Sequence, residues 1–490
     1  MVQNDYDVIV IGAGPGGSTS AALLAKRGLK TLVVDKNPKA GGTMMTFSKD
    51  GFTYEMFPVF GVPAYEDKFS DVIREIGIED KVETFRPNPL GLMCYEDETG
   101  KINQMISRGG TDSIDPNELF SFLNIREEEM EATILFLAEL TEMKPHEVDR
   151  LDDLSVNEFL DRYTLPHGLK VFIACLMAEG NLEVPADVAS ASEFIRCFQD
   201  TATGGAIRYY GGGFGGLFEK FCETVKENGG ELIFDNRVKK IEVKDGNVSK
   251  VVTEKGTFYA PIVISNAGIQ PTVLKLIDKE HFDKSYINWA KELVPSLGFC
   301  GYRYFLNKRV LEYPYIGYIS HNAITTSTDI AKSIEGEMPE APYLWMQTNS
   351  LFPGMAPEGK QLIHTGITCP SDPDMDYTPW REKLEEIIAK VIPELLDCID
   401  RKEPFGPEHV PALSKDAVLP GQGGECIGLA QIVGQTGKYK PSIKGPIGGL
   451  FYVGTDAGGY GLGTHSAVTS GVNVAKTVIK YRHTHGSYYK

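Results

Sequence analysis

The sequence predicts an α/β fold with two intertwined domains, one of which takes segments from both ends and the middle of the chain. A short β-branched run, a glycine-rich turn and a helix follow one another at residues 7–27, and the same succession recurs at residues 450–475. Residues 238–264 alternate between extended runs and turn residues, which predicts an inserted β-meander. At 490 residues the chain is long enough for two cores.

The N-terminal motif has the order of a Rossmann dinucleotide-binding unit. In residues 7–11 the four that follow Asp7 are apolar and β-branched, as expected for a buried parallel strand, and residues 18–27 are expected to form a helix of mostly small residues. The turn between them fits the pattern GxGxxG, and Asp35 ends the following strand. Strand, glycines, helix, strand and acid in this order predict a bound dinucleotide, either NAD or FAD.

Each part of this motif has a physical role in binding a dinucleotide. Gly12 allows the tight turn, Gly14 lets a pyrophosphate approach the backbone, and Gly17 lets the helix pack on the strand. The helix N-terminus offers free N–H groups and the positive end of a dipole to phosphates. The carboxylate of Asp35 suits ribose hydroxyls and would repel a 2′-phosphate.

The C-terminal motif favours FAD over NAD. Residues 450–453 predict a buried strand, residues 454–467 a glycine-rich loop and residues 468–475 a helix. An extended flavin cofactor can use both helix N-termini. One would face its pyrophosphate, and the other would lie beside the N1–C2=O edge of the flavin, where reduction places negative charge.

Four blocks of this sequence resemble the FAD-dependent amine oxidase superfamily, and within it the phytoene desaturase and retinol saturase-like branch of carotenoid oxidoreductase type. They are residues 8–35, 41–43, 211–238 and 449–471. The resemblance implies a Rossmann-like FAD-binding domain with an inserted β-meander, and a second, α+β substrate domain. It therefore supports the fold class that the local patterns predict.

The resemblance also implies roles for single residues. Gly41 and Gly42 would bring backbone near the pyrophosphate and flavin, and Val238 would pair with adenine through its backbone. The family commonly has an acid directly after the glycine of the C-terminal loop, whereas here Thr455 precedes Asp456, so which of the two contacts the ribityl chain is open. The cofactor-binding residues expected in all are Gly12, Gly14, Pro15, Gly16, Gly17, Asp35, Lys36, Gly41, Gly42, Thr43, Val238, Gly454, Thr455, Asp456, Gly463 and Thr464.

A second glycine cluster at residues 211–216 also satisfies GxGxxG. One interpretation is a nicotinamide site for NAD(P)H. The other is a turn into a helix that returns the chain to the FAD domain. The run before the cluster is not an apolar strand, and no ribose-binding acid follows at the expected distance, so we favour the turn.

The expected domain boundaries follow these blocks. Residues 1–65, 201–268 and 425–490 are assigned to the FAD-binding domain, and residues 66–200 and 269–424 to the substrate-binding domain. Within the second domain, residues up to about 200 are expected to be mostly helical. Extended runs are expected over residues 296–368, and a helix over residues 378–391. The Pro/Gly-rich stretch at 404–424 is expected to be a return linker.

Composition narrows the function further. The net charge of −18 argues against nucleic acid and allows at most peripheral membrane contact. No apolar run reaches the length of a membrane span, and the first strand begins too early to leave room for a signal peptide. Eight scattered cysteines without a CxxC pair suggest neither a metal site nor disulfides, so we expect a cytoplasmic protein without a bound metal.

The expected chemistry is transfer of a hydride between flavin N5 and a C–C bond of an apolar or alicyclic substrate, as in a desaturase, dehydrogenase or saturase. A quinone, oxygen or another redox protein would serve as electron partner. The alternatives are flavin-dependent double-bond isomerisation without net redox change, amine oxidation, and a lipid-binding module similar to the GDP-dissociation inhibitors.

A proton must also move at the neighbouring carbon. The candidates for this catalytic role are His465, Tyr210, Tyr460 and Asp200, because each lies in or beside a flavin-associated block. His465 is the first choice. It lies at the start of the last predicted helix, where the positive dipole end discourages protonation and leaves a neutral imidazole.

Overall fold

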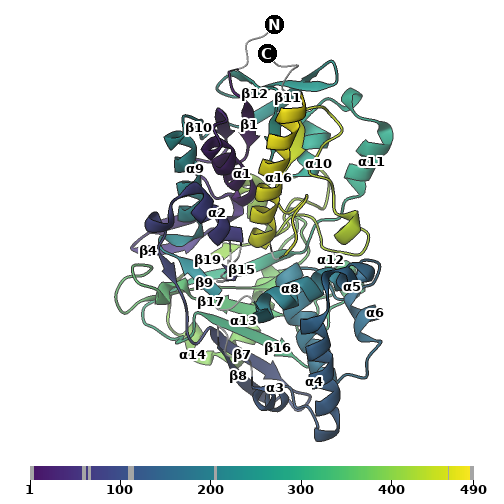
Figure 1. The fold of residues 1–490 in the computed structure, drawn as a ribbon. Helices are drawn as coiled ribbons and strands as arrows, with labels where there is room; N and C mark the ends of the chain where they lie inside the picture. The colour runs from purple at the N-terminus through teal and green to yellow at the C-terminus, as the bar shows by residue number, and fades with distance from the viewer. Residues whose placement is uncertain are drawn as a thin grey trace.

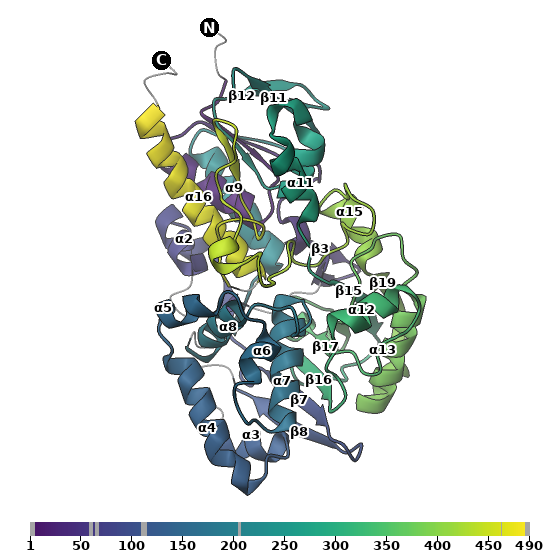
Figure 2. The same cartoon turned by 90° about the vertical axis from the view of Figure 1, so that its right-hand side faces the viewer.

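The computed structural model describes residues 5–57, 62–63, 68–108, 115–203, 207–461 and 463–485. The expected α/β class is confirmed. A parallel sheet with its helices lies at one end of an elongated molecule, and a mixed sheet with its own helices lies at the other (Figures 1 and 2).

The parallel sheet takes its strands from three distant parts of the chain. Its order is β10-β2-β1-β14-β20, and every neighbouring pair is parallel. The four strands other than β10 are buried along their whole length, which is typical of a parallel sheet covered on both faces. The strands are β1 (Val8–Ile11), β2 (Thr31–Val34), β10 (Glu231–Ile233), β14 (Val263–Ser265) and β20 (Leu450–Tyr452).

Alternate residues of the strands face two different layers. Val8 and Val10 of β1 pack with helices α1 (Pro15–Lys26), α9 (Gly213–Glu227) and α16 (Gly463–His485). In Figure 1 the first and last of these helices, α1 and α16, lie side by side. Helix α2 (Lys68–Ile76) packs against both of them.

The opposite face of the sheet is covered by the meander and a short helical segment. Ile9 and Ile11 of β1 pack in this layer. The layer consists of β11 (Val238–Lys244), β12 (Asn247–Thr253), β13 (Thr257–Tyr259), α10 (Ile269–Pro271) and α11 (Lys284–Glu292).

The expected meander over residues 238–264 includes an extended run at 257–264, and the prediction that this run is a single strand is wrong. Strand β13 ends at Tyr259, and Val263–Ser265 forms β14 in the parallel sheet instead. Pro261 lies between them and has no N–H to donate to a ladder, so the chain leaves the meander there.

The second region is built on a seven-stranded mixed sheet, ordered β19-β15-β18-β17-β16-β7-β8. Its strands are β7 (Gly91–Glu96), β8 (Ile102–Ser107), β15 (Gly298–Leu306), β16 (Tyr315–Ser320), β17 (Leu344–Gln347), β18 (Gln361–Cys369) and β19 (Ile399–Phe405). Its helices are α3 (Pro116–Phe122), α4 (Glu127–Glu142), α5 (Pro145–Val148), α6 (Val156–Leu160), α7 (His167–Phe172), a π-helix (Ile173–Leu182), α8 (Ala191–Thr203), α12 (Ser327–Ile334), α13 (Thr378–Val391) and α14 (Pro393–Leu396).

Two expectations for this region need correction. The mostly helical stretch before residue 200 also contains the hairpin β7–β8, because β7 pairs in parallel with β16, which lies more than 200 residues later. The expected return linker begins inside β19 and contains the short helix α15 (Val410–Leu413).

Short strands link the two regions. Strands β3 (Thr46–Lys49) and β4 (Phe52–Glu55) pair with each other, and β9 (Ile207–Tyr210) pairs with β5 (Val62–Pro63) and β6 (Thr84–Phe85). Over the described residues, no helix combines the length and the apolar character that a bilayer span requires.

The contact between α1 and α16 generates a stability prediction. A Cβ added to Gly471 would lie 2.7 Å from Thr19 Cβ and 2.8 Å from the carbonyl oxygen of Gly16. The change Gly471→Val should therefore force the helices apart and lower the free energy of unfolding by about 1–3 kcal/mol. Lys476→Ala, on the exposed side of the same helix, should change it by less than about 0.5 kcal/mol. Chemical denaturation measures both, and an unchanged Gly471→Val midpoint would contradict the tight contact.

Candidate functional site

A cavity lies at the edge where the carboxyl ends of β1, β2, β14 and β20 meet the second region. Ligands of open α/β sheets bind at this edge, because the loops that leave neighbouring strands converge there. The predicted cofactor-binding residues that line it are Gly12, Gly14, Pro15, Gly16, Asp35, Lys36, Gly42, Thr43, Val238, Gly454, Thr455, Asp456, Gly463 and Thr464.

Two predicted residues support the cavity wall from behind. A Cβ on Gly17 would lie 2.0 Å from the carbonyl oxygen of Gly12, so only glycine lets α1 begin this close to the turn. Gly41 has φ of +120°, and its N–H donates to the carbonyl of Ala13 at 2.9 Å. Neither residue lines the cavity itself.

The N-terminus of α1 opens into the cavity. Its N-cap residue, Gly14, offers no side chain to cap the free N–H groups, and the first turn holds no acidic residue. These N–H groups and the helix dipole are therefore available to an anionic ligand such as a pyrophosphate. The other glycine cluster, residues 211–216, does not line the cavity and leads into α9, as the turn interpretation expects.

Asp35 is buried at the end of β2 and lines the cavity. Its Oδ2 accepts the N–H of Ala13 at 2.6 Å, and its Oδ1 accepts the N–H of Asn37 at 2.7 Å. Burial raises the pKa of this carboxyl, and the two N–H donors act in the opposite direction. These bonds hold the carboxyl group in place, and each oxygen keeps a further lone pair for a ribose hydroxyl.

The ammonium of Lys36 is tied to the late part of the chain. It lies 3.0 Å from Asp416 Oδ1 and donates to the carbonyl of Pro411 at 3.0 Å. The guanidinium of Arg237 also pairs with Asp416, at 2.7 Å. Lys36 thus fixes the wall of the cavity through Asp416.

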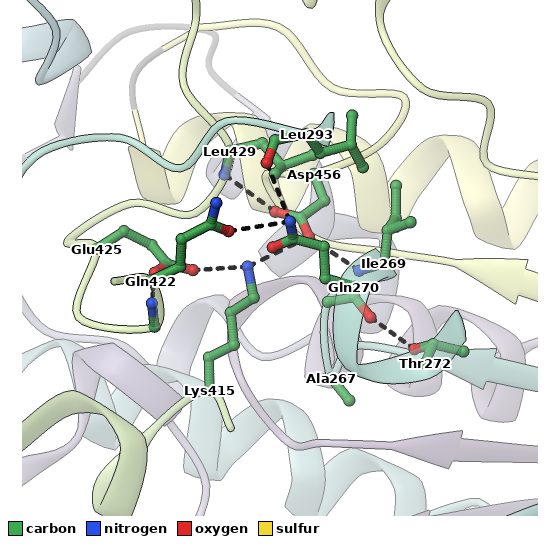
Figure 3. Close-up of polar contacts among 12 residues, drawn as sticks. Ala267, Ile269, Gln270, Thr272, Leu293, Lys415, Gln422, Glu425, Leu429 and Asp456 are labelled. Carbon is green, nitrogen blue, oxygen red and sulfur yellow. Dashed lines mark hydrogen bonds and ion pairs between the residues drawn. The ribbon is translucent and has the colours of Figure 1, made fainter. Parts of the chain in front are cut away.

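Figure 3 shows how Asp456 lies among its partners. Its Oδ2 accepts the N–H of Ile269 at 3.0 Å, and its Oδ1 accepts the N–H of Leu429 at 3.2 Å. The ammonium of Lys415 lies 2.6 Å from Glu425 Oε1 and 3.8 Å from Asp456 Oδ2. Both oxygens of Asp456 are thus engaged with the protein, whereas its neighbour Thr455 lies against Gly428 and also lines the cavity.

Lys415 remains charged although it is buried. Burial alone would lower the pKa of this ammonium, but Asp456 and Glu425 outweigh it and raise the pKa. Sequence reasoning missed Lys415 and Glu425, because they lie in or next to the stretch expected to be a linker and form no recognisable motif.

Two of the four catalytic candidates lie close to each other, and of these His465, but not Asp200, lines the cavity. His465 is the third residue of α16. A Cβ on Gly461 would lie 2.8 Å from His465 Nδ1 and 3.6 Å from Asp200 Oδ2, so both side chains converge on this glycine. Burial raises the pKa of Asp200, and the charge of His465 opposes that shift.

The other two candidates lie away from the cavity lining. Tyr210 is buried and stacks on Phe69, with ring centroids 6.1 Å apart, and Phe69 in turn stacks on His465 at 6.2 Å. Tyr460 is 45% exposed, and the guanidinium of Arg196 lies 5.1 Å from its ring. Phe69 thus contacts both Tyr210 and His465, and Tyr460 is partly exposed to solvent.

Residues 17–479 match the flavin containing amine oxidoreductase family. The chain belongs to this family. Membership implies FAD, and the site fits it, since an uncapped helix N-terminus and a buried acid line a cavity in which glycines leave room for the cofactor's approach. The protein is therefore an FAD-dependent enzyme of the amine oxidoreductase family.

Three relatives illustrate how distant the similarity is. Prolycopene isomerase 2 of an Oncidium hybrid cultivar is 25% identical over 84% of this chain and 74% of its own length. An inactive all-trans-retinol 13,14-reductase of Danio rerio is 22% identical over 61% of this chain and 53% of its own. A 4,4′-diapolycopene oxygenase of Methylomonas is 26% identical over 56% and 59%. The relatives thus differ in the reaction for which they are named.

Solved structures agree on the fold. An oxidoreductase from Methanosarcina mazei superimposes with a TM-score of 0.71 over 96% of this chain and 100% of its own, at 17% sequence identity. At this identity the likeness shows a common architecture and nothing finer.

The geometry of Asp35 predicts how FAD binding responds to its removal. Asp35→Ala should weaken FAD retention by about 1.5–3 kcal/mol, the range for hydrogen bonds to a charged group. Asp35→Asn, which keeps one carbonyl acceptor, should lose less. FAD titration of the stripped protein measures both, with Asp71→Ala on the exposed side of α2 as control. Unchanged affinity in Asp35→Ala would mean that no ribose hydroxyl meets this carboxylate.

Proposed function

We propose that this protein transfers a hydride between flavin N5 and a C–C bond of an apolar or alicyclic substrate, as a desaturase, dehydrogenase or saturase. The observation that carries the proposal is the wall of the cavity nearest the second region. Phe57, Cys426 and Ile427 line it there, and the π-helix end contributes Gly180 and Asn181. Such a wall suits a substrate with few polar groups.

The relatives support an apolar substrate, since their names refer to prolycopene, diapolycopene and retinol. FAD, when bound, supplies the two-electron chemistry. The chain's own residues orient the substrate, exclude water and move the proton. We assign the last task to His465, because its ring lines the cavity and Asp200, which interacts with it electrostatically, would stabilise the imidazolium.

Double-bond isomerisation without net redox change is the second candidate. The similarity to the prolycopene isomerases, which extends over more of the chain than the other two similarities, favours it. Both reactions need FAD and an apolar cavity, and they differ in whether electrons leave the substrate. Amine oxidation and a lipid-binding module without flavin are the remaining alternatives.

An anaerobic experiment on the FAD-loaded protein separates these reactions. For the proposed function, a saturated substrate should bleach the visible flavin absorption in equal amount, or an unsaturated one such as all-trans-retinol should reoxidise the reduced flavin. Conversion of prolycopene to other isomers at constant flavin absorption would instead support the isomerase, and bleaching by amines an amine oxidase. A colourless protein that does not take up FAD would favour the lipid-binding module.

The same experiment tests the electron partner. NADPH should bleach the flavin slowly or not at all, because residues 211–216 lead into α9 and do not line the cavity. Rapid bleaching in equal amount would restore the nicotinamide interpretation of that cluster.

The position of His465 predicts a loss of rate with FAD retained. His465→Ala should keep its flavin absorption and bind substrate, yet lose about 10²–10⁴ in turnover, the usual range for acid–base help. His465→Asn should recover little, because an amide cannot shuttle a proton. His483→Ala, on the exposed part of the same helix, should behave as the wild type. Loss of FAD in the alanine variant would instead assign His465 to bracing the loop.

A further inference from the structure

Glu183 occupies an unusual place on the wall that the second region contributes. It caps the π-helix Ile173–Leu182, with φ of 53° and ψ of 47°. Left-handed backbone in a residue other than glycine costs of order 1–3 kcal/mol and persists only where the surroundings impose it. A π-helix is likewise frequent at functional sites. The strain therefore indicates that the surroundings hold Glu183 in a defined position on the cavity wall.

The side chain of Glu183 is buried and lines the cavity. Its carboxyl group bonds the thiol of Cys426, and its Oε2 has no hydrogen-bond partner among the described residues. A buried polar atom without a partner is uncommon and calls for a ligand or a chemical role. Here the atom belongs to a residue that borders the cavity.

The surroundings keep this carboxyl group neutral. Burial raises the pKa of Glu183 to about 8, although the hydrogen bond with Cys426 acts in the other direction. The other ionisable groups that line the cavity are Asp35, Lys36, Arg237, Lys415, Asp416, Glu425, Cys426, Asp456 and His465. None of the cations among them counteracts the shift, and only the hydrogen bond with Cys426 does. At neutral pH the group is therefore a carboxylic acid with a proton to give.

Glu179, one helical turn earlier, provides an internal comparison. It is equally buried, and burial raises its pKa to about 8 as well. Its Oε1 accepts the N–H of Thr325 at 3.2 Å, and its Oε2 accepts the hydroxyl of Thr368 at 3.3 Å. Glu179 does not line the cavity. The two acids share burial, and only Glu183 has an oxygen left for a molecule in the cavity.

We propose that Glu183 is a catalytic acid that gives its proton to a carbon atom of the unsaturated substrate in this cavity, which leaves His465 the opposite task of taking a proton when a C–C bond is oxidised. The assignment rests on the proposed function, since it requires an apolar substrate beside the flavin. It makes that function more specific, because it favours reactions in which the substrate gains a proton. These are saturation of a C=C bond and isomerisation driven by protonation.

The balance of each reaction is simple. In saturation, one carbon of the C=C bond receives a hydride from reduced FAD, the neighbouring carbon receives the proton of Glu183, and solvent reprotonates the carboxylate. In isomerisation, the proton adds to one carbon of a conjugated chain, the weakened double bond rotates, and the same proton returns to Glu183 with no net transfer of electrons. Saturation uses one reduced FAD per turnover, so a two-electron donor such as a reduced quinone or another redox protein must reduce the flavin again, whereas isomerisation needs no such donor.

Glu183→Gln is the sharpest test, because glutamine keeps the shape and the hydrogen bond to Cys426 but has no acidic proton. The variant should retain FAD and show the wild-type change in flavin spectrum when retinol or prolycopene binds. Its conversion of these probes should fall by about 10²–10⁴. In the wild type, kcat/KM should fall as pH rises through about 8, because the acid loses its proton, and the variant should lack this limb.

A measurement without turnover supports the same assignment. A carboxyl group whose folded pKa is raised stabilises the fold fully below its unfolded pKa of 4.5 and loses that contribution as pH rises from there to its folded pKa of about 8. The melting temperature of Glu183→Gln relative to the wild type should therefore increase across that range. Glu179→Gln is the matched control, since it should show a similar thermal effect while its kcat/KM keeps the alkaline limb.

The outcomes are distinct. Near-normal turnover of Glu183→Gln with FAD bound would overturn the role of Glu183 and leave the proposed function intact. Loss of FAD from the variant would overturn it too and assign Glu183 to the cofactor. The proposed function, and the role of Glu183 with it, would be overturned if the wild-type protein holds FAD but converts none of three probes. The probes are retinol, prolycopene and a saturated analogue.

Discussion

The close approach of separate backbone segments around the first glycine turn is the constraint on which the cavity depends. A Cβ on Gly14 would lie 2.8 Å from Asn266 Nδ2, and one on Gly16 would lie 2.9 Å from the nitrogen of Gly454. A Cβ on Gly42 would lie 3.0 Å from Gly14 Cα. Because side chains do not fit between these segments, the wall consists of backbone N–H groups and a helix end, the surface that a pyrophosphate requires.

Partly buried ion pairs then hold the late part of the chain against these backbone segments. Asp416 pairs with Lys36, Arg237 and Lys275 at 2.6–3.0 Å. Burial opposes ionisation of Asp416, but the three cations outweigh it and hold its pKa well below the usual range. Removing one member of such a partly buried group leaves charge uncompensated, so the segment after β19 has little freedom to move although it contains little regular structure.

Local pattern accounts for much of the fold. The runs that become β1, β2 and β20 are mostly apolar, each has a glycine within three residues of one end, and α13 begins and ends at the residues expected. The hairpin β7–β8 could not be found in this way, because its place depends on pairing with a strand from another part of the sequence. For the break between β13 and β14, the local sequence offers Pro261 as its one indication that a strand ends there.

The residues of the candidate site also fall into two groups, those that the sequence identifies and those that only the tertiary structure brings together. The sequence by itself determined the glycine turn, Asp35 and the loop at Thr455, since phosphate and ribose binding need these residue types at a short, fixed spacing. Tertiary structure alone brought Asp200 to His465, engaged both oxygens of Asp456, and placed Glu183 on the cavity wall. The physical reason is that burial and partner choice set the role of an acid, and both arise only when distant segments pack.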